Sequence, residues 1–162
     1  MIVKDAPAFV VNRLLMRFMG EITDALDEGT PPEIADSAMD PLGLPMTSFE
    51  LLGLVGPGVA LHVGQSLNSS LGERYRISPT IERLVKAGVK TFYVKDEKGN
   101  QSINPEAAAC LQPGDKPSTA DQVRLRALTA LASEARMMLD EGVIATPAEI
   151  DLCMILGTCW PL

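Results

Sequence analysis

The sequence has 162 residues, of which 46% are apolar, and its 14 basic and 21 acidic side chains give a formal net charge of −7. This length fits one medium-sized domain, or one and a half small ones. The acidic balance argues against a nucleic-acid surface, which needs clustered Lys and Arg to displace counterions from phosphates. No apolar run approaches the roughly 20 residues that cross a bilayer, and the first residues lack the pattern of a secretion signal. We therefore expect a soluble, cytoplasmic protein with no membrane span and no nucleic-acid partner.

The residue types that usually bind metals are scarce. Cys110, Cys153 and Cys159 are odd in number and form no C-x-x-C pair, which favours free buried thiols over disulfides or a zinc site. His62 is the sole histidine and has no second ligand four residues away, so we interpret it as structural, on the wall of a helix. No metal site is expected.

The spacing of apolar residues predicts an all-α fold. Aromatic residues make up only 4%, and apolar residues recur at intervals of three and four. A first long helix should begin after Pro7 and end at Gly29. Its face opposite the apolar stripe carries Arg13, Arg17, Glu21, Asp24 and Glu28. Thr30, Thr47 and Ser78 are predicted N-caps of further helices.

The remaining segments are predicted from their glycines and prolines. Residues 53–58 read Gly-Leu-Val-Gly-Pro-Gly, which has the wrong spacing for a dinucleotide fingerprint and follows no predicted strand, so we expect a helix-to-helix turn. Residues 97–118 combine turn residues and prolines, and we predict a surface linker with room for one helical turn at 107–111. A second long helix should run from Ser118 through Gly142, with Leu125 among its buried positions.

A repeated pattern suggests duplication. Both long helices close on Leu-Asp-Glu-Gly, at 26–29 and 139–142, and a predicted Thr-Pro-x-Glu helix cap follows each, at 30–33 and 146–149. Because the order of these features is also shared, the sequence predicts a duplicated helical unit. We expect a first unit at 1–96, a linker at 97–118 and a partial second copy at 119–162. The second copy has no counterpart of 49–71, so some of its apolar surface should need a partner, unless the sequence was trimmed.

Asn12 is the polar residue that most needs an explanation. It lies in the first turns of the first long helix, where an amide competes with the backbone for hydrogen bonds. Two interpretations remain open. The amide could form a buried hydrogen bond to a neighbouring helix or loop. Alternatively, it could point at a ligand carbonyl or a catalytic group and supply one donor and one acceptor at a fixed place.

Several segments resemble one enzyme family. Residues 4–15, K-D-A-P-A-F-V-V-N-R-L-L, resemble the K-D-x-P-G-F-x-x-N-R signature of the C-terminal domain of L-3-hydroxyacyl-CoA dehydrogenases. Residues 43–52, G-L-P-M-T-S-F-E-L-L, are also similar, and K-T-F-Y at 90–93 resembles a shortened form of the family's K-T-G-x-G-F-Y ending. The resemblance covers about residues 2–95. The copy from about Asp121 resembles the second such domain in the multifunctional alpha subunit of the fatty acid β-oxidation complex.

The resemblance implies roles for individual residues. Asn12 matches the family's active-site asparagine, beside the substrate's 3-oxygen and the catalytic histidine, and Pro45 and Met46 match the turn that borders the acyl-CoA cleft. This chain departs from the family pattern at three places, with Ala8 for Gly, Thr47-Ser48 for Gly-Pro, and Gly53 for Asp. The family binds NAD and carries its catalytic His-Glu pair on the preceding domain, so we expect no cofactor in this chain.

Our primary interpretation is a helical 3-hydroxyacyl-CoA dehydrogenase C-terminal-like domain with a partial second copy. It would be the substrate-binding and dimerisation domain of an NAD-dependent (S)-3-hydroxyacyl-CoA dehydrogenase of fatty acid β-oxidation, inactive without its nucleotide-binding domain. The expected partners are that N-terminal domain, an acyl-CoA substrate and further copies in a homo-oligomer. One alternative is a non-catalytic helical interaction or dimerisation module, which would use the eight methionines at adaptable interfaces. Another is a related dehydrogenase that acts on a different hydroxy acid.

Overall fold

The computed structural model describes residues 4–112 and 114–161. The elements in chain order are α1 (Val11–Asp27), α2 (Pro32–Ser37), the 3-10 helix η1 (Asp40–Leu42), α3 (Ser48–Val55), α4 (Pro57–Leu71), α5 (Pro79–Ala87), β1 (Tyr93–Lys95), β2 (Gln101–Ile103), α6 (Pro105–Ala109), α7 (Ala120–Asp140) and α8 (Pro147–Thr158). Helices dominate and the two short strands pair only with each other, so the all-α prediction is confirmed. Met1, Pro113 and Leu162, which belong to the predicted units and linker, lie outside the described residues.

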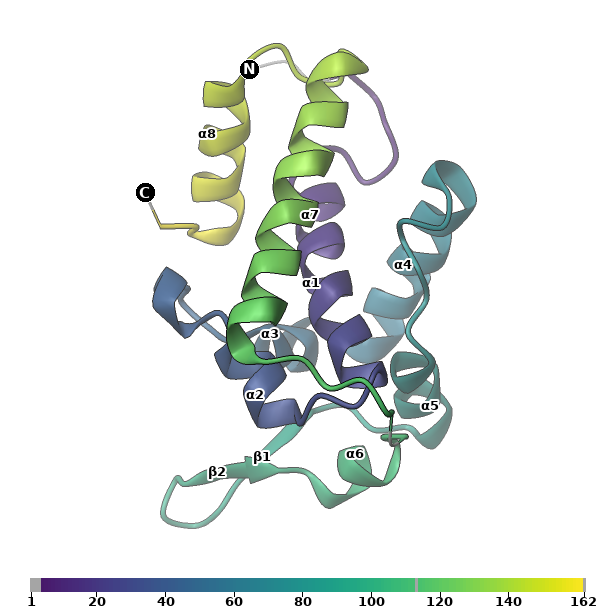
Figure 1. Ribbon diagram of the computed structural model, residues 1–162, viewed down its shortest axis with the longest axis vertical. Coiled ribbons are helices and arrows are strands. Elements are labelled where there is room, and N and C mark those ends of the chain that lie inside the picture. The colour runs from purple at the N-terminus through teal and green to yellow at the C-terminus, as the bar shows by residue number, and fades with distance from the viewer. Residues whose placement is uncertain (1–3, 113, 162) are drawn as a thin grey trace.

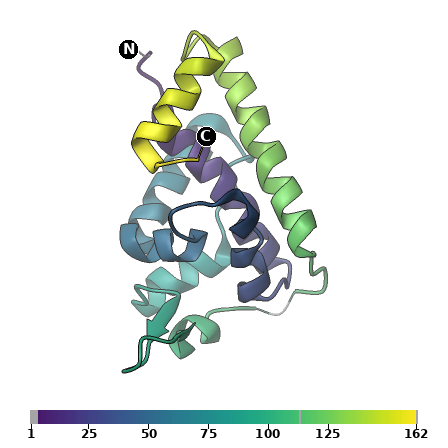
Figure 2. The ribbon, with the colours of Figure 1, turned by 90° about the vertical axis from the view of Figure 1, so that its left-hand side faces the viewer.

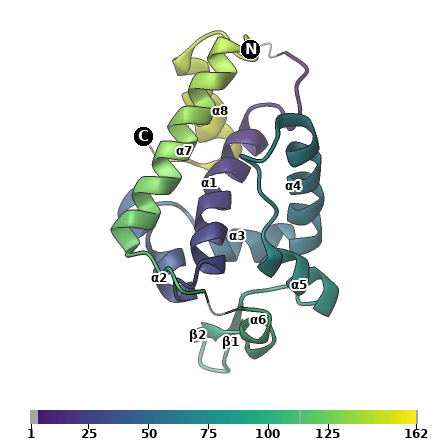
Figure 3. The ribbon, with the colours of Figure 1, turned by 45° about the vertical axis from the view of Figure 1, so that its right-hand side comes forward.

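Helix α1 lies at the centre of the molecule, with α7 along one side and α4 along another (Figures 1 and 3). One core surrounds its second half, where Phe18 and Ile22 pack with Phe49 of α3 and Leu84 of α5. A second core surrounds its start and includes residues of α7 and α8: Val10, Leu14, Met138, Val143, Ile144, Ile150 and Met154. Figure 2 shows α8, in yellow, folded back beside α7 and the start of α1. None of the helices described has the length and apolar character needed to cross a membrane.

Most predicted helix caps form. Complete capping boxes begin α3 and α8 through Thr47–Glu50 and Thr146–Glu149, and Ser78 caps α5. Thr30 corrects the prediction, because α2 has Pro31 at its N-cap position and no side-chain cap. The Thr30 hydroxyl instead accepts a hydrogen bond of 2.9 Å from the backbone N–H of Ser118. It therefore anchors the segment that leads into α7.

Helix α1 begins later than predicted, at Val11 rather than directly after Pro7. Ala8 and Phe9 adopt left-handed backbone conformations, with φ of 60° and 52°. This region is costly for residues with a Cβ atom and easy for glycine. The N-cap residue Val10 also offers no side-chain hydrogen bond, so α1 starts without the stabilising features of most other helices.

The segment predicted as a surface linker is partly buried. Ala107 and Cys110 are buried in the main core. Gly114 touches the end of α1, where an added Cβ would lie 2.1 Å from the carbonyl carbon of Glu28. The surface expectation is wrong for these residues, while the limits of the predicted units stay a prediction.

The charged face of α1 packs against α7 rather than facing water. When the two Leu-Asp-Glu-Gly ends are aligned, each long helix carries one arginine and two glutamates at matched positions: Arg13, Glu21 and Glu28 on α1, and Arg126, Glu134 and Glu141 on α7. Each arginine hydrogen-bonds to both glutamates of the other helix. The short helices that follow the two long helices show the same exchange: α8, which follows α7, contacts α1, and α2, which follows α1, contacts α7. Such reciprocal contacts are those of a two-fold relation between two copies.

Three smaller expectations need correction. Leu125, predicted on the buried side of α7, is 68% exposed. Of the three cysteines only Cys110 is buried, whereas Cys159 is exposed. His62 is exposed on α4 rather than part of a packed helix wall.

Candidate functional site

Asn12 is the second residue of α1, and its side chain is exposed. It lines a cavity beside the helix. Its carboxamide forms no hydrogen bond with any residue that the structure describes, so the buried hydrogen bond of the first interpretation is not present. An amide that is both exposed and unpaired at a cavity has its donor and its acceptor available to a ligand.

The cavity beside Asn12 has a volume of about 250 Å³ and lies between α1, α3 and α4. Residues 74–78 and the start of α5 complete its wall. Its surface is mainly apolar, with side chains from three helices: Met16, Met19, Leu51, Val55, Val59 and Val63. A concave apolar surface with few polar groups is typical of small-molecule sites.

The other polar side chains that line this cavity already have partners. The Tyr75 hydroxyl donates to the Arg13 carbonyl oxygen over 3.1 Å, and Arg17 pairs with Glu21 over 2.7 Å. Hydrogen bonds or ion pairs are also formed by the remaining polar residues of the lining, which are Thr23, Asp24, Arg74, Arg76 and Ser78. Among the lining residues, all of which are described, Asn12 is therefore the polar side chain that is free to bind a ligand.

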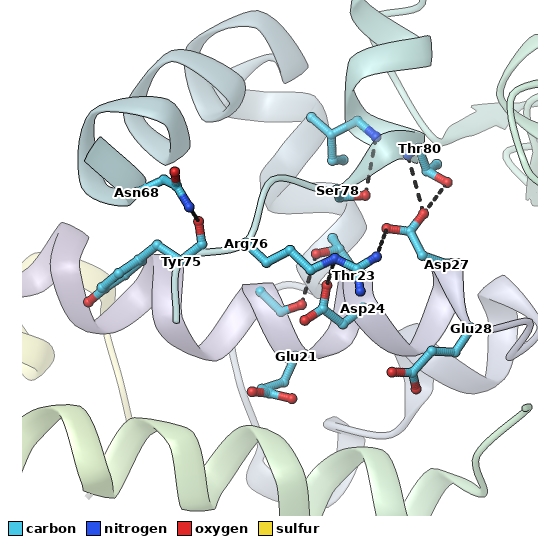
Figure 4. A network of polar contacts seen from close by, with 12 residues as sticks. Glu21, Thr23, Asp24, Asp27, Glu28, Asn68, Tyr75, Arg76, Ser78 and Thr80 are labelled. Carbon is cyan, nitrogen blue, oxygen red and sulfur yellow. Dashed lines mark hydrogen bonds and ion pairs between the residues drawn. The ribbon is translucent and has the colours of Figure 1, made fainter. Parts of the chain in front are cut away.

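An arginine and two carboxylates hold the segment before α5 against α1 (Figure 4). Arg76 Nε lies 3.5 Å from Asp24 Oδ1, and Arg76 Nη2 lies 3.9 Å from Asp27 Oδ2. Asp27 Oδ1 also accepts hydrogen bonds from the backbone N–H and the hydroxyl of Thr80. Burial raises the pKa of Asp24 to about 6, although Arg76 opposes this rise. This cluster fixes one wall of the cavity.

Pro45 and Met46 border a different cavity. Both are exposed, and they line a space of about 240 Å³ with three carboxylates, those of Asp36, Asp40 and Glu50. Asp36 accepts hydrogen bonds from the backbone N–H of Phe49 and from the Tyr93 hydroxyl. The structure thus does not bring Pro45 and Met46 together with Asn12, and the acidic lining of the second cavity disfavours an anionic ligand.

Metal ligands do not cluster among the described residues. No group of three or more His, Cys, Asp or Glu side chains among them could hold a metal ion. Residues 53–58 form the predicted helix-to-helix turn, in which Gly56, with φ of 92°, directly joins α3 to α4. They cannot form a phosphate-binding loop between a strand and a helix, so this turn does not fit a dinucleotide.

Our interpretation of the sequence missed most of the residues that form the Asn12 cavity. Met16 and Met19 occur within an apolar pattern that equally fits a filled core. Two glycines in helix interiors, Gly20 in α1 and Gly64 in α4, line the cavity from two sides. Glycine weakens a helix interior, so these two residues were the available signal.

Comparison with known proteins connects this geometry to a family. The model of the 3-hydroxyacyl-CoA dehydrogenase C-terminal domain matches residues 9–97. The fatty acid oxidation complex subunits alpha of Shewanella putrefaciens and Shewanella amazonensis are 31% and 28% identical, over 99% of this chain and 24% of each relative. This chain thus spans about a quarter of the length of these relatives.

A solved structure supports the same fold. The crystal structure of 3-hydroxybutyryl-CoA dehydrogenase from Escherichia coli K12 aligns with a TM-score of 0.75 at 21% identity, over 98% of this chain and 52% of that chain. The family match covers more than half of the sequence and includes Asn12 and both cavities. The chain belongs to the family of 3-hydroxyacyl-CoA dehydrogenase C-terminal domains.

Proposed function

We propose that this chain is the substrate-binding and dimerisation part of an NAD-dependent (S)-3-hydroxyacyl-CoA dehydrogenase of fatty acid β-oxidation, acting in the cytoplasm. The family match and the names of the relatives support this assignment. The observation that carries it is the exposed, unpaired carboxamide of Asn12 at an apolar cavity. A preceding nucleotide-binding domain would supply the NAD site and the catalytic base, so we assign no step of the hydride transfer to this chain.

Asn12 would position the oxygen on carbon 3 of the substrate. Its N–H can donate to that oxygen, while its carbonyl can accept from a protonated base on the other domain. Asn12 also lies in the first turn of α1, where the helix end carries a partial positive charge. A preorganised donor at this place stabilises an oxygen that gains negative charge during the reaction.

We also propose that residues 119–162 are a partial second copy of the unit at 1–96, connected by 97–118. The reciprocal ion pairs between α1 and α7 support this division. Their two-fold arrangement is that of a dimer interface within one chain. Homo-oligomers would then form through other surfaces.

The test combines this chain with a separately produced nucleotide-binding domain of a fatty acid oxidation complex subunit alpha. Oxidation of a 3-hydroxyacyl-CoA is followed by the absorbance of the reduced nicotinamide. Asn12→Ala should lower kcat/KM by roughly 10²- to 10³-fold, as loss of a transition-state donor does. Gln65→Ala, which removes an exposed amide of α4 outside the cavity lining, is the matched control and should leave kcat/KM unchanged.

This experiment separates an enzyme from a non-catalytic module. A module that only associates would bind its partners equally well before and after the Asn12→Ala substitution, and would give no Asn12-dependent oxidation. Equal activity of the Asn12→Ala and unaltered mixtures would contradict the proposed role of the amide. Equal thermal unfolding of both proteins ensures that a loss of activity is not a loss of folding.

A further inference from the structure

We infer that the cavity between α1 and α4 holds the acyl chain of the substrate, and that Gly20 sets the length of chain it accepts. The identity of the ligand as an acyl thioester rests on the proposed function. The affinity of the cavity for a medium-length acyl chain can be measured independently of any catalysis.

Close packing accounts for a glycine in another helix. A Cβ atom at Gly157 of α8 would lie 2.9 Å from Val11 Cγ2. This contact is tight enough to favour glycine, so Gly157 needs no functional explanation.

Gly20 is different. It lies in the interior of α1 with no left-handed backbone, and an added Cβ would meet no atom within 4 Å. Glycine weakens a helix interior relative to alanine, and neither backbone strain nor crowding explains why glycine occurs at this position. Since Gly20 lines the cavity, what its missing side chain provides is space within that cavity.

The facing wall has the same feature. Gly64 lies in the interior of α4, and a Cβ atom there would be 3.6 Å from Met16 Cε, an ordinary contact. Figure 3 shows α4 running beside α1, which places these two glycines on neighbouring helices. The absence of both side chains keeps the space between the helices open.

The chemistry of the cavity selects its occupant. Its apolar lining favours a hydrocarbon chain, and its one uncommitted polar side chain, Asn12, can bind the oxygenated end of that chain. A methylene group is similar in size to a water molecule, whose share of the liquid is roughly 30 Å³. The volume of about 250 Å³ leaves room for several methylene groups, and an octanoyl chain is a suitable probe of it. The cavity at Pro45 and Met46, with its three carboxylates, is the poorer candidate.

The first experiment measures binding to the chain alone. Octanoyl- and acetyl-N-acetylcysteamine, two neutral thioesters, are titrated calorimetrically into the unaltered chain, Gly20→Leu and Gly58→Leu. Gly58 is the matched control, because an added Cβ there also meets nothing within 4 Å while the residue is exposed and does not line the cavity. Each methylene excluded from apolar surroundings lowers affinity about fourfold, so displacing two or three methylenes should weaken octanoyl binding by roughly 15- to 60-fold in Gly20→Leu alone.

The second experiment measures selectivity in the reconstituted dehydrogenase. Gly20→Leu should lower kcat/KM for 3-hydroxyoctanoyl-CoA relative to 3-hydroxybutyryl-CoA by more than about tenfold, and Gly58→Leu should not. Gly20→Ala, which fills less space and strengthens the helix, should fall between the two and confirm that the fold tolerates a side chain here.

The outcomes distinguish the two proposals. Octanoyl binding that is absent from the unaltered chain, or that is unchanged in Gly20→Leu, overturns the acyl-chain cavity even if Asn12-dependent oxidation is observed. Conversely, octanoyl binding that Gly20→Leu removes supports the cavity even if the reconstituted mixture oxidises no 3-hydroxyacyl-CoA, a result that would overturn the proposed function instead.

Discussion

The two long helices have the same ion-pair residues in very different surroundings. On the Arg13 side, the side chains of Arg13 and Glu134 are both fully buried, and Arg74 adds a second cation to Glu134. On the Arg126 side, Arg126 is 32% exposed and Glu21 is 16% exposed. The loop before α5 supplies Arg74 and Tyr75 to the first cluster, whereas Glu21 in the second cluster receives its second arginine, Arg17, from its own helix. We therefore expect the ion pairs of the buried Arg13 cluster to contribute more to the stability of the fold than those of the Arg126 cluster.

The outer faces of α1 and α7 differ more than the faces that meet. The cavity-lining residues Met16, Met19 and Gly20 of α1 match Thr129, Ala132 and Ser133 of α7, all of which are exposed. The matched positions of α7 are thus more polar and more exposed than the cavity wall of α1. Within the predicted second copy, exposed apolar side chains occur on α8, where Leu152 is 45% exposed and Leu156 is 75% exposed.

The largest expected effect comes from breaking the buried cluster. Glu134→Ala removes the carboxylate that Arg13 and Arg74 share and leaves the buried Arg13 with only the partly exposed Glu141. It should lower the free energy of unfolding by about 3 kcal/mol, since breaking a buried ion pair is strongly destabilising. Urea unfolding followed by circular dichroism measures this change. Although burial alone would raise it, hydrogen bonds from Arg74 and Arg13 lower the pKa of Glu134, so the carboxylate is charged at neutral pH.

Glu21→Ala is the matched control for this prediction. It removes the carboxylate that Arg126 and Arg17 share in the more exposed cluster, and its effect should stay below about 1 kcal/mol and shrink further at high salt. Equal losses for both variants would show that burial does not separate the two clusters. A salt-sensitive loss in Glu134→Ala would contradict the idea that its ion pairs are shielded from solvent.

A second difference between the helices is Asp24, whose matched position in α7 holds Met137. Burial, reinforced by Glu21, Asp27 and Glu28, raises the pKa of Asp24 from 3.8 to about 6. The folded protein therefore holds the Asp24 proton more tightly than the unfolded chain does. The resulting stabilisation is present below pH 4 and is lost as the pH rises through 6.

Asp24→Asn should therefore stabilise the chain at pH 8 by about 2 kcal/mol and change little at pH 4. Urea unfolding at both pH values tests the prediction. If Asp24→Asn is instead the less stable protein at pH 8, the ion pair with Arg76 outweighs the cost of burying the carboxylate.

The sequence was sufficient to predict most of the helices, while the duplication of the helical unit stays a prediction. Apolar spacing and capping residues such as Thr47 and Thr146 located most helix starts, since both signals are local. The exposed position of Asn12 at a cavity agrees with one of its two interpretations, although its chemical role stays a prediction.

What escaped prediction depends on tertiary contacts. An amphipathic pattern does not distinguish a face in water from one that meets a charged partner, so the burial of Arg13 was missed although Arg126 repeats its spacing. Thr30 has the sequence of a cap but bonds to Ser118, because the incoming segment competes for its hydroxyl. The separation of Asn12 from Pro45 and Met46 likewise follows from how α1 and α3 pack, which spacing along the chain does not encode.

The smallest expected effect lies at the starts of the two helices. Helix α7 begins with a capping box formed by Thr119 and Gln122, whereas α1 follows left-handed Ala8 and Phe9 and has no side-chain cap. Ala8→Gly relieves roughly 1–2 kcal/mol of left-handed strain. The greater freedom of glycine in the unfolded chain offsets about 0.5–1 kcal/mol of this gain.

Ala8→Gly should therefore raise the free energy of unfolding by up to about 1 kcal/mol, measured by urea or thermal unfolding. Ala132→Gly makes the same substitution at an exposed position within α7, where the backbone is helical, and should lower stability by about 1 kcal/mol. If Ala8→Gly raises the free energy of unfolding and Ala132→Gly lowers it, the difference in backbone conformation between the two positions is the cause. If both variants are destabilised alike, Ala8 carries no left-handed strain, and the later start of α1 must instead result from the packing of Val10.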